Sequence, residues 1–248
     1  MIHKVTRHVR TVEDVLDLMD GLFEADADRW TAAHGGSWWD GFYADRDRPV
    51  PFFVDKPDQN LVDLLERGTL HPGRALDLGC GPGRNALYLA QHGFDVDAID
   101  LSTEAVDWAR ERADQLDLPV RFQVGDAFTP DGIDSLDGPY DLVYDSGCLH
   151  HLAPHRRVAY LRLLERHLAP GGHVVIVCFA RGEMGSELDD GDLYLHGGLE
   201  GGLSFDESDL RWLLQDLDVL EVRPMVDQPA DSATFGEPFL LTVLARRP

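Results

Sequence analysis

Three glycines between an apolar strand and an apolar helix form the part of the sequence best suited to bind a ligand. Gly79, Gly81 and Gly83 follow the strand-like segment Ala75–Leu78 and precede residues with helical apolar spacing. Because glycine has no Cβ, a ligand can contact the main chain at such a turn. Asp77 stands two residues before the first glycine, and the third glycine comes one residue earlier than in the dinucleotide fingerprint G-x-G-x-x-G. The spacing therefore indicates a nucleotide-like ligand.

Two further aspartates are the last residues of short strand-like segments that follow the glycine turn. Asp100 ends the segment Phe94–Asp100, about twenty residues beyond the glycines, where a carboxylate can accept both hydroxyls of a ribose. Ser102 then suits the N-cap of the next helix. Asp126 ends the segment Val120–Asp126. A single aspartate can simply solvate a loop, but three at successive strand ends favour a shared ligand site.

The order of an acidic residue, one spacer and G-x-G-x-G resembles the first motif of the class I S-adenosylmethionine (SAM) dependent methyltransferases. The turn Leu168-Ala-Pro-Gly-Gly172 is a second feature similar to that family. The resemblance implies SAM as the cofactor, with Asp126 on the adenine amino group and Phe128 beside the ring. The residues that it assigns to the cofactor are Asp77, Gly79, Cys80, Gly81, Gly83, Asn85, Asp100, Leu101, Ser102, Asp126, Ala127, Phe128, Asp145 and Ser146.

Two histidines follow the fourth expected strand and are the candidate catalytic residues. Parallel sheets bind ligands beyond the carboxyl ends of their strands, so residues 145–151 should face the same crevice as the glycine turn. Methyl transfer needs mainly positioning, but His150 or His151 could act as a base if the acceptor holds its proton tightly. A histidine bonded to the backbone at a helix start is the alternative. His155 would complete a metal-like spacing, yet Pro154 interrupts it, and we expect no metal.

Strands and helices alternate along the chain, which predicts an α/β fold with a doubly wound, mostly parallel sheet. The family resemblance implies a Rossmann-like sheet of seven strands, in which the last strand runs antiparallel between its neighbours. A chain of 248 residues without a visible linker predicts one domain overall. Within it we expect an N-terminal helical cap and aromatic lid over residues 1–70 and a SAM-binding core over residues 71–248.

Aromatic residues gather before the first strand of the core. The segments Trp38–Tyr43 and Pro49–Phe53 are rich in aromatics, and their glycine and prolines predict irregular structure. Here the resemblance narrows to the thiopurine and tellurite-resistance-like branch of the methyltransferases, where aromatic side chains close over SAM. It implies lid roles for three residues: Trp39, Tyr43 and Phe52. Covering the hydrophobic end of the sheet is the alternative role.

Two capping patterns and one long loop complete the expected elements. Thr11 with Asp14 predicts the start of a first helix, and Ser204 with Glu207 predicts the start of a late one. Between them, the glycine-rich residues 181–203 predict a loop longer than is usual inside a compact domain. We expect this loop to form a wall of the acceptor pocket through Met184, Leu193, Tyr194 and His196.

Charge and composition limit the partners. A net charge of −23 would repel phosphate backbones, so we expect a small-molecule acceptor and no nucleic acid. No apolar run approaches the ~20 residues of a membrane span, and an apolar signal core is missing, so we expect a cytoplasmic protein without a membrane partner. Cys80, Cys148 and Cys178 are too far apart to indicate a disulfide framework. A monomer or a homodimer is expected.

The function expected from the sequence is SAM-dependent methylation of a small molecule. The branch that the chain resembles favours a thiol, and a partly ionised, strongly nucleophilic thiol needs no metal or lysine base. An O-methyltransferase of natural-product biosynthesis is a first alternative. A nicotinamide-dependent reductase and a catalytically silent SAM-binding protein are the others.

Overall fold

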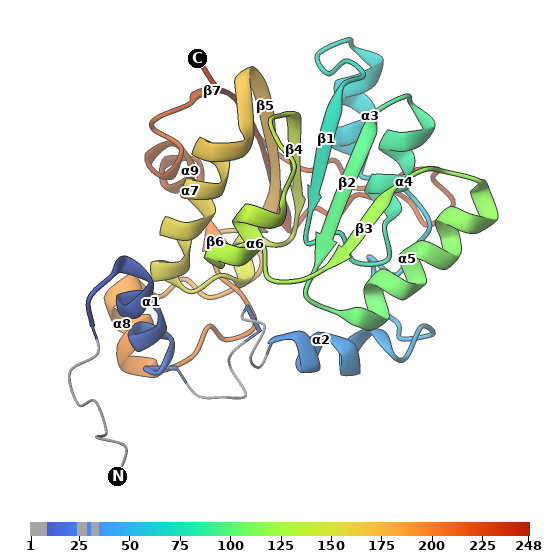
Figure 1. Ribbon diagram of the computed structural model, residues 1–248. Helices are drawn as coiled ribbons and strands as arrows, with labels where there is room; N and C mark the ends of the chain where they lie inside the picture. Colours follow the sequence, from blue (N-terminus) through green and yellow to red (C-terminus); the bar gives the residue numbers. More distant parts are fainter. Residues whose placement is uncertain (1–8, 24–28, 31–34) are drawn as a thin grey trace.

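The computed structural model describes residues 9–23, 29–30 and 35–248. Its centre is a sheet with helices on both faces (Figure 1). The strands are β1 (Arg74–Leu78), β2 (Asp95–Asp100), β3 (Arg121–Val124), β4 (Tyr140–Ser146), β5 (Leu168–Ala180), β6 (Ser204–Phe205), β7 (Asp218–Pro224) and β8 (Leu240–Arg246). The expected α/β fold with a doubly wound sheet is confirmed.

The sheet order is β3-β2-β1-β4-β5-β8-β7, and the short β6 pairs with β5 beside this path. Strands β1 to β5 run parallel, whereas β8 is antiparallel to both β5 and β7. The strand order therefore reverses at β1 and β4, which places the topological switch point beside the glycine turn. The seven-stranded path and its antiparallel strand are as expected, and β6 is an eighth strand that the sequence analysis did not predict.

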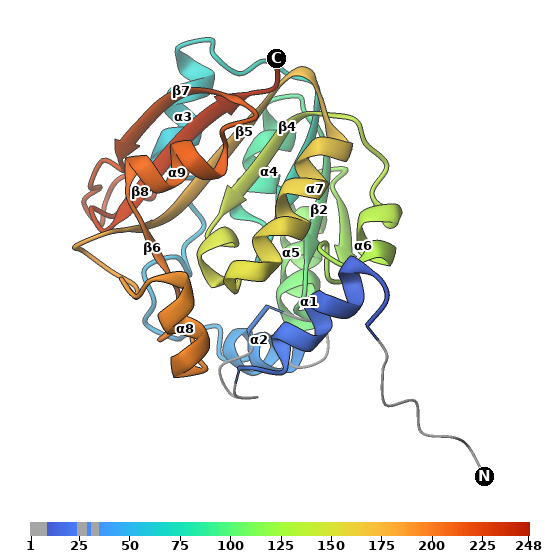
Figure 2. The same ribbon diagram turned by 90° about the vertical axis from the view of Figure 1, so that its left-hand side faces the viewer.

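Each face of the sheet is covered by its own helices. Side chains of a strand alternate between faces, so Leu76 packs toward one cluster and Ala75 toward the other. The first cluster contains residues from α6 (Pro130–Ser135), α7 (Arg157–His167) and α9 (Glu207–Leu213), and α7 and α9 lie in front of the sheet in Figure 2. The second contains residues from α3 (Gln59–Glu66) and α4 (Arg84–Gln91), while α5 (Thr103–Leu116) packs on β2 and β3.

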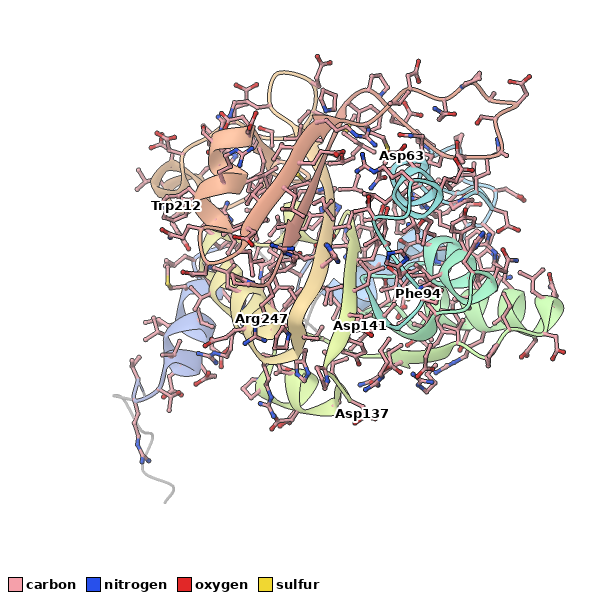
Figure 3. The ribbon with its side chains drawn as sticks, turned by 90° about the horizontal axis from the view of Figure 1, so that it is seen from above. Asp63, Phe94, Asp137, Asp141, Trp212 and Arg247 are labelled. Atoms are coloured by element: carbon pink, nitrogen blue, oxygen red, sulfur yellow. The ribbon has the colours of Figure 1, made fainter. Side chains whose placement is uncertain are left out.

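The two ends of the sheet differ. Helix α2 (Gly35–Tyr43) lies beyond the carboxyl ends of β1 and β2, and α1 (Val12–Asp20) and α8 (Asp190–His196) lie at the same end of the molecule, below α7 (Figure 1). The opposite end carries charged side chains, among them Asp63, Asp141 and Arg247 (Figure 3). Asp63 pairs with Arg223 at 3.3 Å, and Asp141 accepts a 2.8 Å hydrogen bond from the main chain of Arg74.

The structure corrects three expectations. Residues 35–43 form the helix α2, although the sequence predicted irregular structure there. Helix α9 is capped by Asp206 and Asp209, because Ser204 belongs to β6 and its predicted partner Glu207 is the first helical residue. The predicted loop 181–203 contains helix α8 and a bridge between Ser186 and Leu203. The capping box of Thr11 with Asp14 is confirmed.

The predicted cap, residues 1–70, includes residues 1–8, 24–28 and 31–34, which lie outside the described residues. Its described parts are α1, α2, α3 and the segments beside them. None of the helices found in residues 9–23, 29–30 and 35–248 is long and apolar enough to cross a bilayer.

Candidate active site

A cavity of about 400 Å³ lies at the carboxyl ends of β1, β2 and β4. Its walls come from the glycine turn, from the residues that follow β2, β3 and β4, and from α2 and the segment after it. A volume of this size is typical of sites for small ligands. The 3-10 helix η1 (Leu149–His151) brings both candidate histidines to the same space.

The glycine turn is shaped for contact with a ligand. Gly79, Gly81 and Gly83 have φ angles of 68°, 52° and 80°, a region that L side chains rarely adopt. A Cβ on Gly81 would lie 3.0 Å from the hydroxyl oxygen of Tyr43. The main-chain nitrogen of Gly81 donates a 2.8 Å hydrogen bond to the carboxylate of Asp100, which joins the turn to the end of β2.

Asp100 is fixed by hydrogen bonds from the main chain. Its carboxylate accepts hydrogen bonds of 2.8 Å from the main-chain nitrogens of Gly81 and Ser102. Burial raises the pKa of Asp100 to about 6. Each carboxylate oxygen keeps further acceptor capacity, so ribose hydroxyls could donate to it and stabilise its charged form. Asp126 is held similarly, since it accepts 2.8 Å from the main-chain nitrogen of Phe128.

Asp77 gives the clearest sign that the site fits SAM. Its Oδ2 is buried and has no hydrogen-bond partner among the described residues, and the side chain lines the cavity. Burial raises the pKa of Asp77 to about 8. A buried acceptor without a partner is costly, so the site suits a ligand that brings a donor or a cation. The ammonium group of the SAM methionine moiety is such a cation.

An ion-paired network behind the turn was missed by the sequence analysis, except for Asn85 and Ser146. Arg84 forms an ion pair with the fully buried Asp58 and donates to the hydroxyl of Ser146 at 3.2 Å. Asn85 and Tyr144 also donate to Asp58, at 3.0 and 2.7 Å. The network holds the start of α4 in place beneath the cavity. No local sequence pattern predicts the role of Asp58, because its partners Arg84, Asn85 and Tyr144 are far away in sequence.

The cavity lining includes most of the residues expected to bind the cofactor: Asp77, Gly79, Cys80, Gly81, Asn85, Asp100, Leu101, Asp126, Ala127, Phe128, Ser146, Trp39, Tyr43 and Phe52. Gly83, Ser102 and Asp145 do not line it. Ser102 donates a 2.7 Å hydrogen bond to Asp40 of α2. Asp145 accepts from the main-chain nitrogen of Cys148 at 2.7 Å, and burial raises the pKa of Asp145 to about 7. Gly83 thus belongs to the turn itself, while Ser102 and Asp145 form hydrogen bonds that hold neighbouring segments in place.

His150 is buried, His151 is half-buried, and both rings are neutral at pH 7. The ring of His150 stacks on Phe179 with centroids 3.8 Å apart, and its Nδ1 has no partner among the described residues. Burial lowers the pKa of His150 well below its ordinary value. Burial, and then the charge of Arg29, lower the pKa of His151 to about 3. Each ring therefore offers one donor and one acceptor nitrogen at neutral pH.

His155 lies in a different network. Its Nε2 is 2.6 Å from a carboxylate oxygen of Asp20, and its Nδ1 is 2.9 Å from the hydroxyl of Tyr194. The ring thus joins η2 (Pro154–Arg156) to α1 and α8. Across the described ranges, no three histidine, cysteine or acidic side chains come together in a way that could hold a metal ion.

The aromatic lid residues come from α2 and the segment after it. Trp39 donates from Nε1 to the carbonyl oxygen of Arg29 at 2.6 Å and meets His151 edge-on. Tyr43 stacks on Phe53 with centroids 5.3 Å apart. Trp39, Tyr43 and Phe52 all line the cavity, so the packing role and the lid role fall on the same residues.

We call nine of the other lining residues the acceptor end: Arg29, Trp30, His150, His151, Leu152, Phe179, Met184, Phe235 and Phe239. Of the wall residues expected from 181–203, only Met184 lines the cavity. Leu193 is in the core, Tyr194 contacts His155, and His196 is half-exposed and lies near Glu200.

Comparison with known proteins agrees with this geometry. The family described as a methyltransferase domain matches residues 75–172, from β1 into β5. The chain is 27% identical over 178 residues to the 2-heptyl-1-hydroxyquinolin-4(1H)-one methyltransferase of Mycobacteroides abscessus, covering 71% of this chain and 70% of that protein. It is 31% identical over 183 residues to hemagglutinin 1 of Eikenella corrodens, covering 73% of this chain but only 56% of that protein.

Two solved structures share the fold. One, from work on the conversion of a disulfide bond into a thioacetal group during echinomycin biosynthesis, has a TM-score of 0.68 at 24% identity and covers 86% of this chain and 92% of that one. The magnesium protoporphyrin IX methyltransferase of Synechocystis PCC 6803, with bound S-adenosylhomocysteine, has a TM-score of 0.63 at 21% identity and covers 89% and 100%. Residues 75–172 thus match a methyltransferase domain, and the solved relatives support SAM as its cofactor.

Proposed function

We propose that the whole protein transfers the methyl group of SAM to the sulfur of a small aromatic thiol. The observation that carries this proposal is the composition of the acceptor end, where apolar and aromatic side chains surround two neutral imidazoles. Phe179, Phe235 and Phe239 offer ring surfaces against which a flat acceptor can pack. Among the described residues, neither lysine nor carboxylate lines this end, so no strong base stands beside the acceptor.

The low basicity of the two histidines determines which acceptor the site can use. When bound, SAM supplies a methyl group on a positively charged sulfur, and the chain has to hold the acceptor against it, which can contribute several kcal/mol. Because burial lowers the pKa of His151 to about 3, its ring cannot readily deprotonate an acceptor with a pKa near 10. A thiol, with a pKa near 8.5 and strong nucleophilicity, gives up its proton more easily. The site therefore favours sulfur over an ordinary phenol oxygen.

We assign the two histidines to the acceptor. His150 lies flat on Phe179, and its buried Nδ1 has no partner in the part of the chain that the structure describes, so the oriented ring can still form a hydrogen bond. An imidazole nitrogen can accept the proton of a thiol, or an N–H can donate to a thiolate. The same ring thus either takes up the proton or holds the anion.

The lid supports placement in the thiopurine and tellurite-resistance-like branch. Trp39, Tyr43 and Phe52 line the cavity from the N-terminal side, as that resemblance implies. The structure from the echinomycin work concerns a disulfide and a thioacetal, which is sulfur chemistry in that protein. Both points favour a thiol acceptor for this chain.

An oxygen acceptor is the second candidate. The relative from Mycobacteroides abscessus is named for a hydroxyquinolinone, a flat heterocycle with a hydroxyl group on its ring nitrogen. Such a ring could pack against Phe179 in the same way. This reading corresponds to O-methylation in natural-product biosynthesis.

Initial rates on matched acceptors test the proposal. The purified protein is supplied with SAM and with aryl thiols, the corresponding phenols and N-hydroxy heterocycles, and S-adenosylhomocysteine formation is measured. We expect kcat/KM to be at least about tenfold higher for each thiol than for its phenol, because the thiol ionises more readily. Activity confined to hydroxyl acceptors would establish the second candidate instead. Tight S-adenosylhomocysteine binding without turnover of any acceptor would point to a silent SAM-binding protein.

A further inference from the structure

The acceptor end contains one cation, Arg29, that the proposed methyl transfer does not use. Arg29 lines the cavity and is half-buried. Within the described part of the chain, no carboxylate forms an ion pair with it, and burial lowers the pKa of its guanidinium. The chain as a whole carries a net charge of −23, so carboxylates are abundant elsewhere. A partly desolvated guanidinium that lies on the ring of Trp38 but has no ion pair among the described residues gains stability from an anionic ligand.

Helix α2 fixes the position of Arg29. The carbonyl oxygen of Arg29 accepts the 2.6 Å hydrogen bond from Nε1 of Trp39. The guanidinium carbon of Arg29 lies 4.1 Å from the ring centroid of Trp38. A Cβ on Gly35 would come within 2.8 Å of the Arg29 carbonyl carbon, so the glycine permits this close approach. Arg29 is therefore held from its backbone and from its charged group. Fixed in this way, it loses little freedom when it binds a ligand.

The other charged residues of the cavity already have roles. Arg84 also lines the cavity, but it is paired with Asp58. The acids Asp77, Asp100 and Asp126 lie at or just after the ends of β1, β2 and β3, and the resemblance assigns all three to the cofactor. At the acceptor end the charge of Arg29 faces neutral rings, and its field acts on His151. An anion in this space would meet Arg29 and the two imidazoles without facing a carboxylate of the acceptor end.

We propose that Arg29 binds a carboxylate group of the methyl acceptor, so that the acceptor is an aromatic thiol carrying a carboxylate. This specificity rests on the proposed function for the reacting group, but the anion site is argued from Arg29 alone. A guanidinium matches the planar, two-oxygen carboxylate better than a single sulfur atom, because it can donate two parallel hydrogen bonds. The acceptor would then be bound at two points, with its anion at Arg29 and its ring against Phe179.

Binding of unreactive product analogues tests the anion site without requiring turnover. The probes are 4-(methylthio)benzoate and the uncharged 4-methylthioanisole, titrated by calorimetry into the protein saturated with S-adenosylhomocysteine. We expect the wild type to bind the carboxylate about 10- to 100-fold more tightly, the value of a hydrogen-bonded charge pair. Arg29→Gln should abolish this preference and Arg29→Lys should keep part of it. Arg46→Gln, an exposed arginine paired with Glu111 nearby, should leave it unchanged.

Rates with 4-mercaptobenzoate and 4-methylbenzenethiol then locate the anion. If Arg29 holds a carboxylate, Arg29→Gln lowers kcat/KM for the first thiol and leaves the second almost unchanged. Equal losses for both would show that Arg29 contacts the reacting thiolate, and would overturn the proposal. So would a wild-type protein without any binding preference for the carboxylate. Suppose that the wild type prefers the carboxylate probe, that Arg29→Gln removes this preference, and that no methyl group is transferred to either thiol. That result would support the anion site and contradict the thiol function. Unchanged affinity for S-adenosylhomocysteine confirms that each variant is folded.

Discussion

Trp39 of α2 meets His151 of η1 edge-on, with ring centroids 5.0 Å apart and planes at 71°. The contact joins the N-terminal segment to the residue that follows β4, over more than a hundred residues of sequence. It packs an indole ring against the imidazole of His151, and burial around that imidazole lowers its pKa. The protonation state of the acceptor site therefore depends on α2.

Replacing His150 or His151 by alanine should reduce the rate more for acceptors that hold their proton tightly. General-base assistance is worth about 10²–10⁴ in rate, and it is needed least when the acceptor arrives as an anion. The measurement is kcat/KM for a series of aryl thiols of graded pKa. SAM affinity should remain nearly constant, because neither histidine contacts the glycine turn. A loss of equal size across the series in both variants would leave catalysis to positioning.

The stability of the protein should fall as the pH drops below about 6.5, in part through His151. Burial lowers the pKa of His151 to about 3. Between pH 6.5 and pH 3, His151 is therefore protonated in the unfolded chain but not in the folded chain. The contribution is present above pH 6.5 and is lost progressively toward pH 3. Urea unfolding from pH 7.5 to 5 should show a shallower pH dependence in His151→Gln than in the wild type. Equal slopes would mean that His151 titrates normally.

Binding of SAM near pH 7 should release a proton from Asp77. Burial raises the pKa of Asp77 to about 8, so the free site is mostly protonated at pH 7, and an ammonium group would favour the ionised form. SAM affinity should accordingly rise between pH 6 and 8. Calorimetry in buffers of different ionisation enthalpy measures the released proton directly. Asp77→Asn should remove both effects, and retention of the release would assign it to another group.

Asp100→Asn should weaken SAM binding by about 1.5–3 kcal/mol, the cost of losing hydrogen bonds to a charged group. The contact with the main-chain nitrogen of Gly81 can survive, since the amide keeps one oxygen acceptor. Titration calorimetry gives the affinity, and Asp107→Asn on the exposed surface of α5 serves as the control. Wild-type affinity in Asp100→Asn would refute the ribose assignment.

Gly81→Ala should impair SAM binding through the backbone and through Tyr43. The φ angle of 52° disfavours a side chain, and the new Cβ would lie 3.0 Å from the Tyr43 hydroxyl. Adding Tyr43→Phe removes that hydroxyl and should recover part of the affinity if crowding matters. Gly191→Ala is the matched control, because nothing lies within 4 Å of its Cβ position. Normal binding by Gly81→Ala would show that the turn is only structural.

Arg84→Met should destabilise the fold by about 3–5 kcal/mol, because it leaves the charge of the buried Asp58 without its cation. Arg110→Met removes an exposed pair with Asp107 and should change the unfolding free energy by less than about 1 kcal/mol. Denaturant unfolding of both variants gives the comparison. Similar small effects would mean that hydrogen bonds from Asn85 and Tyr144 suffice for Asp58.

The parts of the site that the sequence predicted are those formed by short segments. The glycine turn and Asp100 are specified by a strand, a tight turn and a second strand, so their spacing survives in the fold. The lining residues Phe235 and Arg29 could not be found in this way. Phe235 reaches the cavity because its backbone pairs with that of Pro57 and Gln59, far away in sequence. Nothing around Phe235 in the chain signals that pairing.

Helix α2 shows why local rules also failed. Its sequence contains three glycines and bulky aromatics, which are poor helix formers. The helix is stabilised from outside, by the ring contact of Trp39 with His151 and by hydrogen bonds that Asp40 accepts from Ser102 and Glu104. Tertiary contacts of this kind override weak propensity. The sequence predicted that these residues would reach the site but not the conformation in which they do so.

The hydrogen bonds of Asp40 have a consequence for the catalytic cycle. Asp40 accepts from the hydroxyl of Ser102 at 2.7 Å and from the main-chain nitrogen of Glu104 at 3.2 Å, at the start of the helix that follows Asp100. Moving α2 away from the sheet would break these bonds close to Asp100 and, at the same time, remove the ring of Trp39 from His151. We therefore expect the departure of S-adenosylhomocysteine and that of the methylated product to share one opening motion, whose speed would limit turnover when the chemical step is fast.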